Sequence, residues 1–527
     1  MFHQSYLNFK RISSESLYNA REVSWARALA MGGRAFLCQI SEKDWKISRI
    51  KGVYGNREGS VKKGAIKYFD EKSNTVQSII EDLIGMRKGD LVFFHVIKKE
   101  KGKESSIHGV YRVREEPFYN RKKIWTSKLV YPYRFCFEPH PDHVELCRYD
   151  AYIPLTRFYA AIEAGLIRSI TTLEREVHGQ AHAVKTLTRE DAKEIIKLLY
   201  REFPLRRSEQ PIKFKPLKIQ GPPLKRFIKR VGELEFAIKA VIAYKLGHED
   251  PEFTKLIPAC RYEEYDFLIQ TFVGPTIRKP VDLICIGYGK LTRAITIIEV
   301  KTKTADINDF IQLLKYQEAF RIRNLKKDDL AYKFSLCLIA QRFKQELMNY
   351  CYLRKMLIPW EEIALVNYVP TSNNRDASFR SEALIKPISF VSKPIPTIRT
   401  SFSEIISNPQ GFYLNLRKEV ASGIHLDILL SKDNVIFLQK RYKRSNFNSI
   451  LGYVLIYVVP AKCTEREFTL FMKQLYDLAE SLKEKFIAIE PIIISRDYDK
   501  LVTYFVEKYN AYEVQAMRQP ISLYVVK

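Results

Sequence analysis

Three charged residues lie inside two apolar segments that otherwise have the composition of buried β-strands. Asp282 stands in VDLICIGY, and Glu299 and Lys301 stand in AITIIEVK. Residues two apart in a strand share a face, so the side chains of Glu299 and Lys301 point the same way. If the strand of Asp282 pairs beside this one, we expect all three groups to converge. Burying two carboxylates and an amine is unfavourable unless another group compensates their charge.

Two interpretations fit these three residues alone. Aspartate and glutamate supply the hard oxygen ligands that Mg²⁺ or Mn²⁺ prefers, and a lysine beside them can orient water and stabilise charge during attack on a phosphodiester. The alternative is a solvent-facing ion pair on an edge strand. The surrounding elements favour the metal centre, because a helix at 306–322 follows the strands and carries polar residues.

The arrangement resembles the PD-(D/E)xK nuclease superfamily, and most closely its archaeal mismatch and flap endonucleases. This resemblance implies that Asp282, Glu299 and Lys301 are catalytic, with Asp282 and Glu299 as ligands of Mg²⁺ or Mn²⁺. The sequence departs from the superfamily in its long loop GYGKLTRA and in the valine that precedes Asp282.

The same resemblance implies two further site residues on helices. An acid on the preceding helix would be a third metal ligand, and in GELEFAIKAVI we prefer Glu235 to Glu233. A polar residue on the following helix is expected too. Gln312 in DFIQLLKYQ fits it, with Tyr316 one turn later.

A second copy of the same fold is expected near the C-terminus. FSEIISNP, GIHLDILL and VIFLQK resemble the same endonucleases, with Glu404 as the helix acid and Asp427 as the strand acid. Leu438 stands where the glutamate of ExK should be, while Lys440 keeps the lysine. We expect a degenerate domain that does not bind metal. The alternative is an unrelated α/β domain with the same element order.

The first 200 residues predict a small β domain. Short strands are expected in GRAFLCQI, GDLVFFHVI, IHGVYRVRE and YPYRFCFEP, and a capped helix in LTREDAKEIIKLLYREF. Together these pieces resemble the EVE/YTH branch of the PUA-like superfamily, whose members bind nucleic acid and often hold a modified, flipped base. A flipped base requires aromatic faces and hydrogen bonds to its edge. The candidate base-binding residues are Tyr54, Asn56, Trp45, Phe94 and Trp125, with His95 and Tyr133 as further candidates.

Composition agrees with a folded protein that binds a polyanion. The 87 Lys and Arg against 60 Asp and Glu give a net charge of +27, which favours nucleic acid through counterion release. No apolar run is long enough for a transmembrane helix, and the eight cysteines form no CxxC pair. We therefore expect a cytoplasmic protein with reduced thiols and no membrane partner.

The sequence thus predicts a multidomain α/β and α+β protein. A PUA-like β-barrel precedes two restriction-endonuclease-like α/β domains, the second of them degenerate. The expected parts are an N-terminal extension (1–30), a base-reading domain (31–203), a linker (204–227), a nuclease domain (228–391), a linker (392–402) and the degenerate domain (403–527).

Three functions remain open at this point. The first is an endodeoxyribonuclease that restricts double-stranded DNA carrying a modified or flipped base, acting alone or as a homodimer. The second is a structure- or mismatch-specific repair endonuclease. The third is a non-catalytic nucleic-acid-binding protein.

Overall fold

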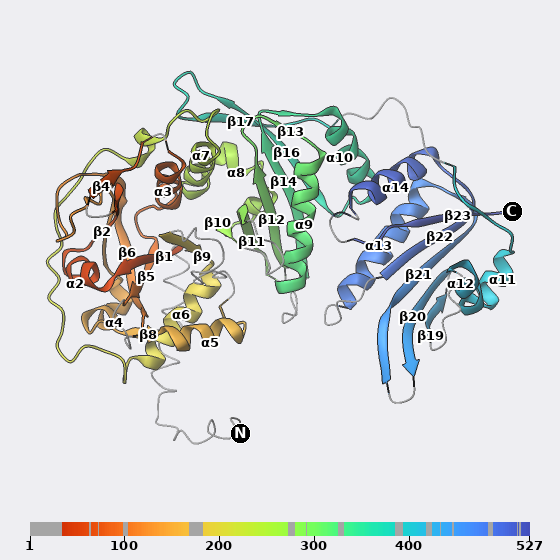
Figure 1. Cartoon of the computed structure of the whole chain (residues 1–527), viewed down its shortest axis with the longest axis horizontal. Coiled ribbons are helices and arrows are strands. Elements are labelled where there is room, and N and C mark those ends of the chain that lie inside the picture. The colour runs from red at the N-terminus through yellow and green to blue at the C-terminus, as the bar shows by residue number, and fades with distance from the viewer. Residues whose placement is uncertain are drawn as a thin grey trace. The chain divides into compact units, whose positions relative to one another are not determined.

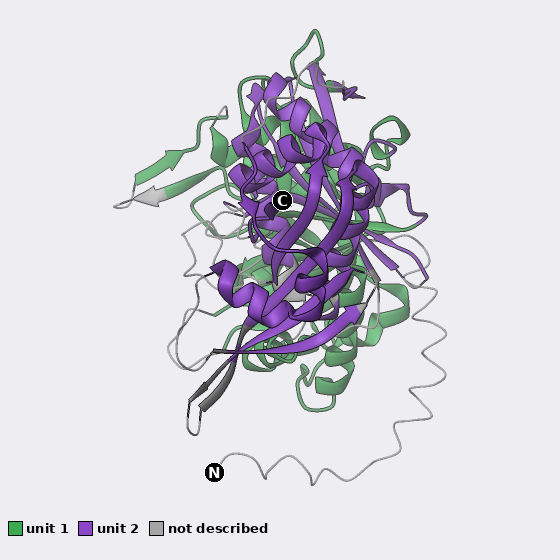
Figure 2. Ribbon diagram, turned by 90° about the vertical axis from the view of Figure 1, so that its right-hand side faces the viewer, with its two compact units in different colours: residues 1–254, 264–271, 370–377 green, residues 255–263, 272–369, 378–527 purple. Residues whose placement is uncertain are grey.

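The computed structural model describes most of the chain in two compact units. It describes residues 34–62, 65–71, 73–98, 104–167, 183–271, 280–290, 292–324, 331–384, 394–417, 424–432, 434–444, 447–482, 489–513, 515 and 518–527. The expected N-terminal extension, 1–30, lies outside these residues. Unit 1 comprises residues 1–254, 264–271 and 370–377, and unit 2 comprises 255–263, 272–369 and 378–527 (Figure 2). Within the described residues, no helix is long and apolar enough to cross a membrane.

Unit 1 is built on a mixed sheet in the order β2-β7-β6-β5-β1-β9. The strands are β1 (Ala35–Ser41), β2 (Val53–Asn56), β5 (Leu91–Ile97), β6 (Ser106–Tyr119), β7 (Tyr133–Pro139), β8 (Tyr152–Pro154), which pairs with β6, and β9 (Val184–Leu187). One face packs mainly aliphatic residues such as Leu37 and Ile107 against α5 (Leu155–Glu163) and α6 (Arg189–Glu202) (Figure 1). The other face is aromatic, with the Phe94 ring centroid 4.7 Å from those of Trp45 and Phe137.

The two sheets of unit 2 share the topology of their four central strands. In the first half of this unit (281–369), β11 (Val281–Tyr288) and β12 (Thr292–Val300) form an antiparallel hairpin. The parallel strands β14 (Ala331–Ala340) and β16 (Glu362–Pro370) follow, reached through α9 (Ile307–Asn324) and α10 (Gln345–Leu357). The expected α/β alternation is therefore present in this half.

The second half of unit 2 (397–527) repeats this order. Antiparallel β20 (Val435–Arg444) and β21 (Phe447–Cys463) are followed by parallel β22 (Ile489–Tyr498) and β23 (Ser522–Val526). Helices α13 (Glu465–Ser481) and α14 (Lys500–Tyr512) make the two crossovers, as α9 and α10 do in the first half (Figure 1). The strand β19 (Ile424–Lys432) pairs with β20 at the end of the sheet.

Two expected elements differ from the structure. The helix expected over 228–246 begins only at Glu235, as α7 (Glu235–Gly247), and belongs to unit 1. The sequence also favours a strand at YEVQAM, but α14 extends to Tyr512, and 514 and 516–517 lie outside the described residues. Tyr512 continues the helix since its ring packs edge-on against Tyr350, with centroids 5.0 Å apart.

Candidate active site and ligand pocket

The structure brings Asp282, Glu299 and Lys301 together at one end of the β11–β12 hairpin. Leu283 pairs with Ile298, so Asp282 and Glu299 occupy the next opposed positions and share a face of the sheet. Both carboxylates are buried, with 7% and 4% of the residue exposed. The Lys301 Nζ lies 2.8 Å from Glu299 Oε1. The geometry is that of a buried carboxylate pair with one ammonium group.

Asp309 is a member of this cluster that the sequence did not reveal. It lies in the first turn of α9, and its Oδ1 is 3.3 Å from Lys301 Nζ. Burial lowers the pKa of Lys301, but the charges of Glu299, Asp309 and Asp282 outweigh burial and raise that pKa well above the usual lysine value. Lys301 is therefore an ammonium at neutral pH, and it can donate hydrogen bonds but cannot accept a proton.

Gln312 and Tyr316 lie on the same face of α9, one turn apart. The Gln312 amide donates to the Tyr316 hydroxyl, and this hydroxyl lies 3.3 Å from the carbonyl oxygen of Pro280. Burial, together with the charges of Glu299 and Asp282, raises the pKa of the Tyr316 phenol. Tyr316 is thus neutral. The charges of Glu299 and Asp282 act on both Tyr316 and Lys301, so α9 lies beside the site.

The donor set fits a hard divalent cation with few protein ligands. Among the described residues, no three or more His, Cys, Asp or Glu side chains form a ligand group. Mg²⁺ is commonly held by one or two carboxylates, with water and substrate phosphate completing its shell. Among the described residues, the carboxylates of Asp282, Glu299 and Asp309 all act on the ammonium group of Lys301. A divalent cation held by two of these carboxylates would balance part of their negative charge.

The third acid expected from the resemblance belongs to unit 1. Glu235 is the first residue of α7 in unit 1, and its Oε1 accepts a hydrogen bond from Lys239 at 3.0 Å. Glu233 precedes that helix and pairs with Arg230 at 2.9 Å. Within unit 2, Asp282, Glu299 and Lys301 form a cluster with Asp309, and Glu235 as a metal ligand stays a prediction.

The second half of unit 2 has no matching carboxylates. In strand order, β20 corresponds to β11 and β21 to β12, and neither VIFLQKRYKR nor FNSILGYVLIYVVPAKC contains an acidic residue. We had matched Asp427 to Asp282, but Asp427 lies one strand further out, on β19, and pairs with Arg441 at 3.0 Å. The strands β19 and β20 are antiparallel and contain apolar runs, as β11 and β12 do. The residue pattern alone therefore matched β19 to β11, although β20 is the strand in the corresponding position.

A pocket of about 830 Å³ opens within unit 1. Its walls come from the ends of β1, β2 and β5, from α3 (Asn74–Ile84) and from the loop before β7. The aromatic lining residues are Phe69, Trp125, Tyr131 and Phe236, and the polar ones include Gln39, Asn56, Asn74, Ser78 and Asp82. Aromatic walls with a few convergent polar groups are typical of small-molecule sites, and this volume accommodates a nucleotide.

Asn56 is the polar group that is best placed to recognise a ligand. It is 6% exposed, and its Oδ1 accepts a hydrogen bond from Tyr54 at 3.0 Å. Its Nδ2 has no hydrogen-bond partner among the described residues. Leaving a buried amide N–H₂ unsatisfied is unfavourable, so this donor is available to a carbonyl or ring nitrogen of a ligand.

Three of the five expected base-binding residues belong to the core instead. Tyr54, Trp45 and Phe94 are almost fully buried and do not line the pocket. Trp45 donates its indole N–H to Asp150, and Tyr54 donates to Asn56 and to backbone carbonyls. They form the aromatic face of the sheet, and this packing role could not be separated from a cage by residue type. His95 and Tyr133 are buried as well.

Trp125 and Asn56 do line the pocket, together with residues that the sequence did not single out. The Trp125 indole N–H donates to Ser48 Oγ at 2.9 Å, which fixes the ring at the wall. Asp82, Ser78 and Asn74 project from α3, a helix that was not predicted. The repeat of apolar residues in NTVQSIIEDLI was the signal that could have located it.

A serine–histidine–aspartate chain also occurs in unit 1, but it is structural. Ser106 Oγ is 2.8 Å from His108 Nε2, and His108 Nδ1 is 2.9 Å from Asp150 Oδ1. Ser106 is fully buried, so no substrate carbonyl can reach its oxygen. Asp150 also accepts hydrogen bonds from Trp45 and Arg49 of α2 (Glu42–Lys51). The three side chains therefore link strand β6 to helix α2 through polar contacts.

Comparison with known proteins gives one partial relative. No family model matches this sequence. The transcriptional regulator GfcR of Picrophilus torridus is 29% identical to this chain over 112 residues, which are 21% of the chain. The matched stretch covers 55% of that protein, so the chain spans about half the length of this curated relative.

Proposed function

We propose that this chain is a metal-dependent endodeoxyribonuclease whose reaction centre contains Asp282, Glu299 and Lys301. The observation that carries the proposal is the convergence of two buried carboxylates and one ammonium group on a single face of the β11–β12 hairpin. A structural ion pair needs one carboxylate, whereas this cluster holds three around one lysine. Phosphodiester hydrolysis uses such a surplus to hold a divalent cation.

Each residue has a distinct part in this reaction. Asp282 and Glu299 would hold Mg²⁺ or Mn²⁺, which when bound neutralises the charge of the scissile phosphate. Lys301 remains protonated, so it orients the attacking water by donating to its oxygen and stabilises the charge of the transition state. The water oxygen bonds to phosphorus and the bond to the leaving sugar oxygen breaks. Solvent takes the water proton and supplies one to the leaving oxygen.

The pocket of unit 1 gives this nuclease a means of choosing its substrate. A base extruded from the duplex would stack on an aromatic wall such as Trp125 and present its edge to Asn56 and Asp82. The pairing of such a reader with a nuclease is consistent with restriction of DNA that carries a modified base. The net charge of +27 and the partial similarity to a transcriptional regulator support DNA as the partner.

A second candidate is a DNA-binding protein without catalysis. It is favoured by the regulator relative and by the two-carboxylate donor set, which is small for a nuclease. In that case the cluster around Lys301 would only hold α9 against the hairpin.

A cleavage panel separates these candidates. Unmodified, cytosine-modified, adenine-modified and mismatched duplexes are incubated with Mn²⁺ or with EDTA, using the wild-type chain and Glu299→Gln. We expect Mn²⁺-dependent cleavage of one modified duplex by the wild type only. Cleavage of the mismatched duplex alone would indicate repair, and tight binding without cleavage of any duplex would indicate the non-catalytic protein.

A further inference from the structure

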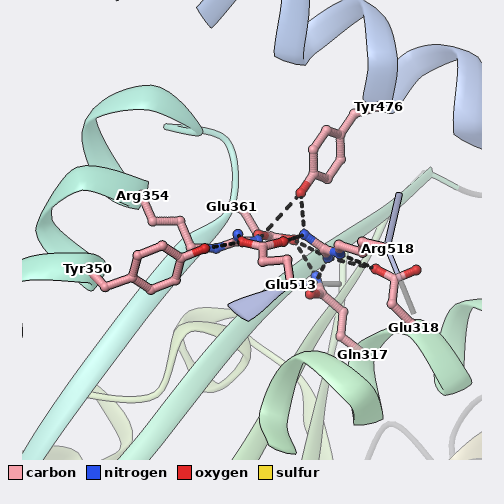
Figure 3. A network of polar contacts seen from close by, with 8 residues as sticks. All are labelled: Gln317, Glu318, Tyr350, Arg354, Glu361, Tyr476, Glu513 and Arg518. Atoms are coloured by element: carbon pink, nitrogen blue, oxygen red, sulfur yellow. Dashed lines mark hydrogen bonds and ion pairs between the residues drawn. The ribbon is translucent and has the colours of Figure 1, made fainter. Parts of the chain in front are cut away.

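A cluster of buried charges joins the two halves of unit 2, and it shares no residue with the carboxylate site. Figure 3 shows its members, which are Gln317, Glu318, Tyr350, Arg354, Glu361, Tyr476, Glu513 and Arg518. Arg354 and Glu513 have no exposed surface, and Glu361 is 2% exposed. Breaking one such pair leaves an uncompensated buried charge, so the contacts define one arrangement of the two halves.

Arg518 belongs to the second half and contacts the first half directly. Its Nη1 lies 2.6 Å from both Tyr476 Oη and Glu513 Oε2, which belong to its own half. Its Nη2 donates to Gln317 Oε1 at 2.9 Å and its Nε donates to Glu318 Oε1 at 2.8 Å. Gln317 and Glu318 lie on α9, so one guanidinium connects the second half directly to this helix.

Arg354 makes the reciprocal connection from α10 of the first half. It donates to Glu513 at the end of α14 and to Glu361, and Glu361 in turn accepts from Gln317. The Tyr350 ring stacks on Phe505 of α14 with centroids 6.0 Å apart. The helices α10 and α14 hold equivalent places in the two sheets, so the repeats meet through matching elements.

The helix that Arg518 contacts also carries the α9 residues of the candidate active site. Asp309, Gln312 and Tyr316 share one face of α9, and Gln317 and Glu318 follow Tyr316 directly. Each residue advances by about 100° around a helix axis, so Arg518 binds the side of α9 that is turned away from Tyr316. A rotation of α9 would therefore move Asp309 away from Lys301.

We propose that Arg518 is a positioning residue for the candidate active site, and that the second half of unit 2 acts as an internal partner that fixes the rotation of α9. In this half, β20 and β21 contain no acidic residue, while Arg518 and α14 contact the first half. The inference rests on the proposed nuclease function for its kinetic test alone, because the placement of α9 can be measured without cleavage.

Two variants and one control test this inference. Arg518→Met removes the guanidinium group. Arg518→Lys keeps the positive charge but lacks the separate N–H groups that contact Gln317 and Glu318. Arg417→Met is the matched control, because Arg417 pairs with Glu490 entirely within the second half. Should Arg518→Met fail to fold, Glu318→Gln removes the α9 end of the same contact. Backbone hydrogen exchange over 307–320 and steady-state kinetics on the cleaved duplex are measured below the unfolding temperature.

We expect exchange in α9 to rise about tenfold in the Arg518 variants and not in Arg417→Met, while exchange in the β-strands stays unchanged. We also expect kcat to fall by about tenfold or more with KM for DNA within about twofold, because misplaced catalytic groups lower the rate of the chemical step. Unchanged exchange in α9, or an equal rise over the whole of unit 2, would overturn the inference. If the wild type cuts no DNA, the proposed function fails and the exchange result still decides whether Arg518 positions α9.

Discussion

Asp282, near the start of β11, accepts a hydrogen bond at 2.8 Å from the backbone N–H of Val300 on the neighbouring strand β12. This bond holds the Asp282 carboxylate beside Glu299, at Val300, the residue that directly precedes Lys301 in the chain. Asp282 therefore has two separable roles, one in the hairpin and one in the charge of the site.

The first prediction separates these roles. Asp282→Asn keeps an oxygen for the Val300 N–H, so we expect a loss of stability below about 1 kcal/mol, whereas Asp282→Ala leaves that N–H unsatisfied and costs about 1–3 kcal/mol. Both variants should lose cleavage, because the amide carries no charge to hold a cation. Thermal unfolding followed by circular dichroism measures the first effect. Equal unfolding temperatures for the two variants would contradict the structural role.

The second prediction concerns the unit 1 pocket. Asn56→Asp preserves the acceptor for Tyr54 but replaces the buried N–H₂ donor with an oxygen. We expect the affinity for the preferred duplex to fall by about 1–3 kcal/mol, with no change for unmodified DNA. Binding is measured by fluorescence anisotropy in EDTA. Asn349→Asp, which makes the same change of charge on α10, is the control, and an equal loss in both variants would argue against the pocket.

The third prediction is a pH dependence. Burial lowers the pKa of Lys185 on β9 to about 8, against 10.5 in an exposed chain. Between these values the unfolded chain binds a proton that the folded chain does not, so the free energy of unfolding rises with pH. Relative to Lys185→Met, wild-type stability should increase from pH 8 to 10.5 by at most about 3 kcal/mol. Urea denaturation at both pH values measures this difference, and a constant difference would refute it.

The fourth prediction follows from the carboxylates on β11 and β12, which β20 and β21 do not repeat. Because neither β20 nor β21 contains an acidic residue, one chain should cut one DNA strand at a time. On a supercoiled plasmid bearing the preferred modification, nicked circles should accumulate first. Linear product should then rise with the square of the protein concentration. Linear product that forms without nicked circles at high dilution would show that one chain cuts both strands.

The sequence predicted the elements of unit 2 better than its packing. Alternating apolar runs located β11, β12 and α9, because buried strands and amphipathic helices leave strong local patterns. The sequence does not identify Asp309 as a site residue, because it lies ten residues after Glu299 and only the fold brings α9 back beside the hairpin. The network around Arg518 joins residues up to about 200 positions apart, and no local pattern encodes such contacts.

In unit 1 the sequence identified the strands but misjudged their faces. Trp45 and Phe94 have the residue types of a base cage, yet Trp45 packs from α2 onto Phe94 of β5 in the aromatic core. Asn56 and Trp125 lie at the pocket, where the sheet opens toward α3, and their role in binding a base stays a prediction. Residue type alone could not show whether an aromatic side chain lines the pocket or packs in the hydrophobic core.

The central claim is tested most directly by Mn²⁺-dependent cleavage with Lys301→Ala beside Lys344→Ala. Lys344 pairs with Asp306 at 3.1 Å in the same half of unit 2 but is exposed, so it controls for loss of a lysine. We predict that Lys301→Ala lowers the single-turnover rate by about 10²-fold or more, while Lys344→Ala stays within about twofold of the wild type. Equal rates for Lys301→Ala and the wild type would contradict the account.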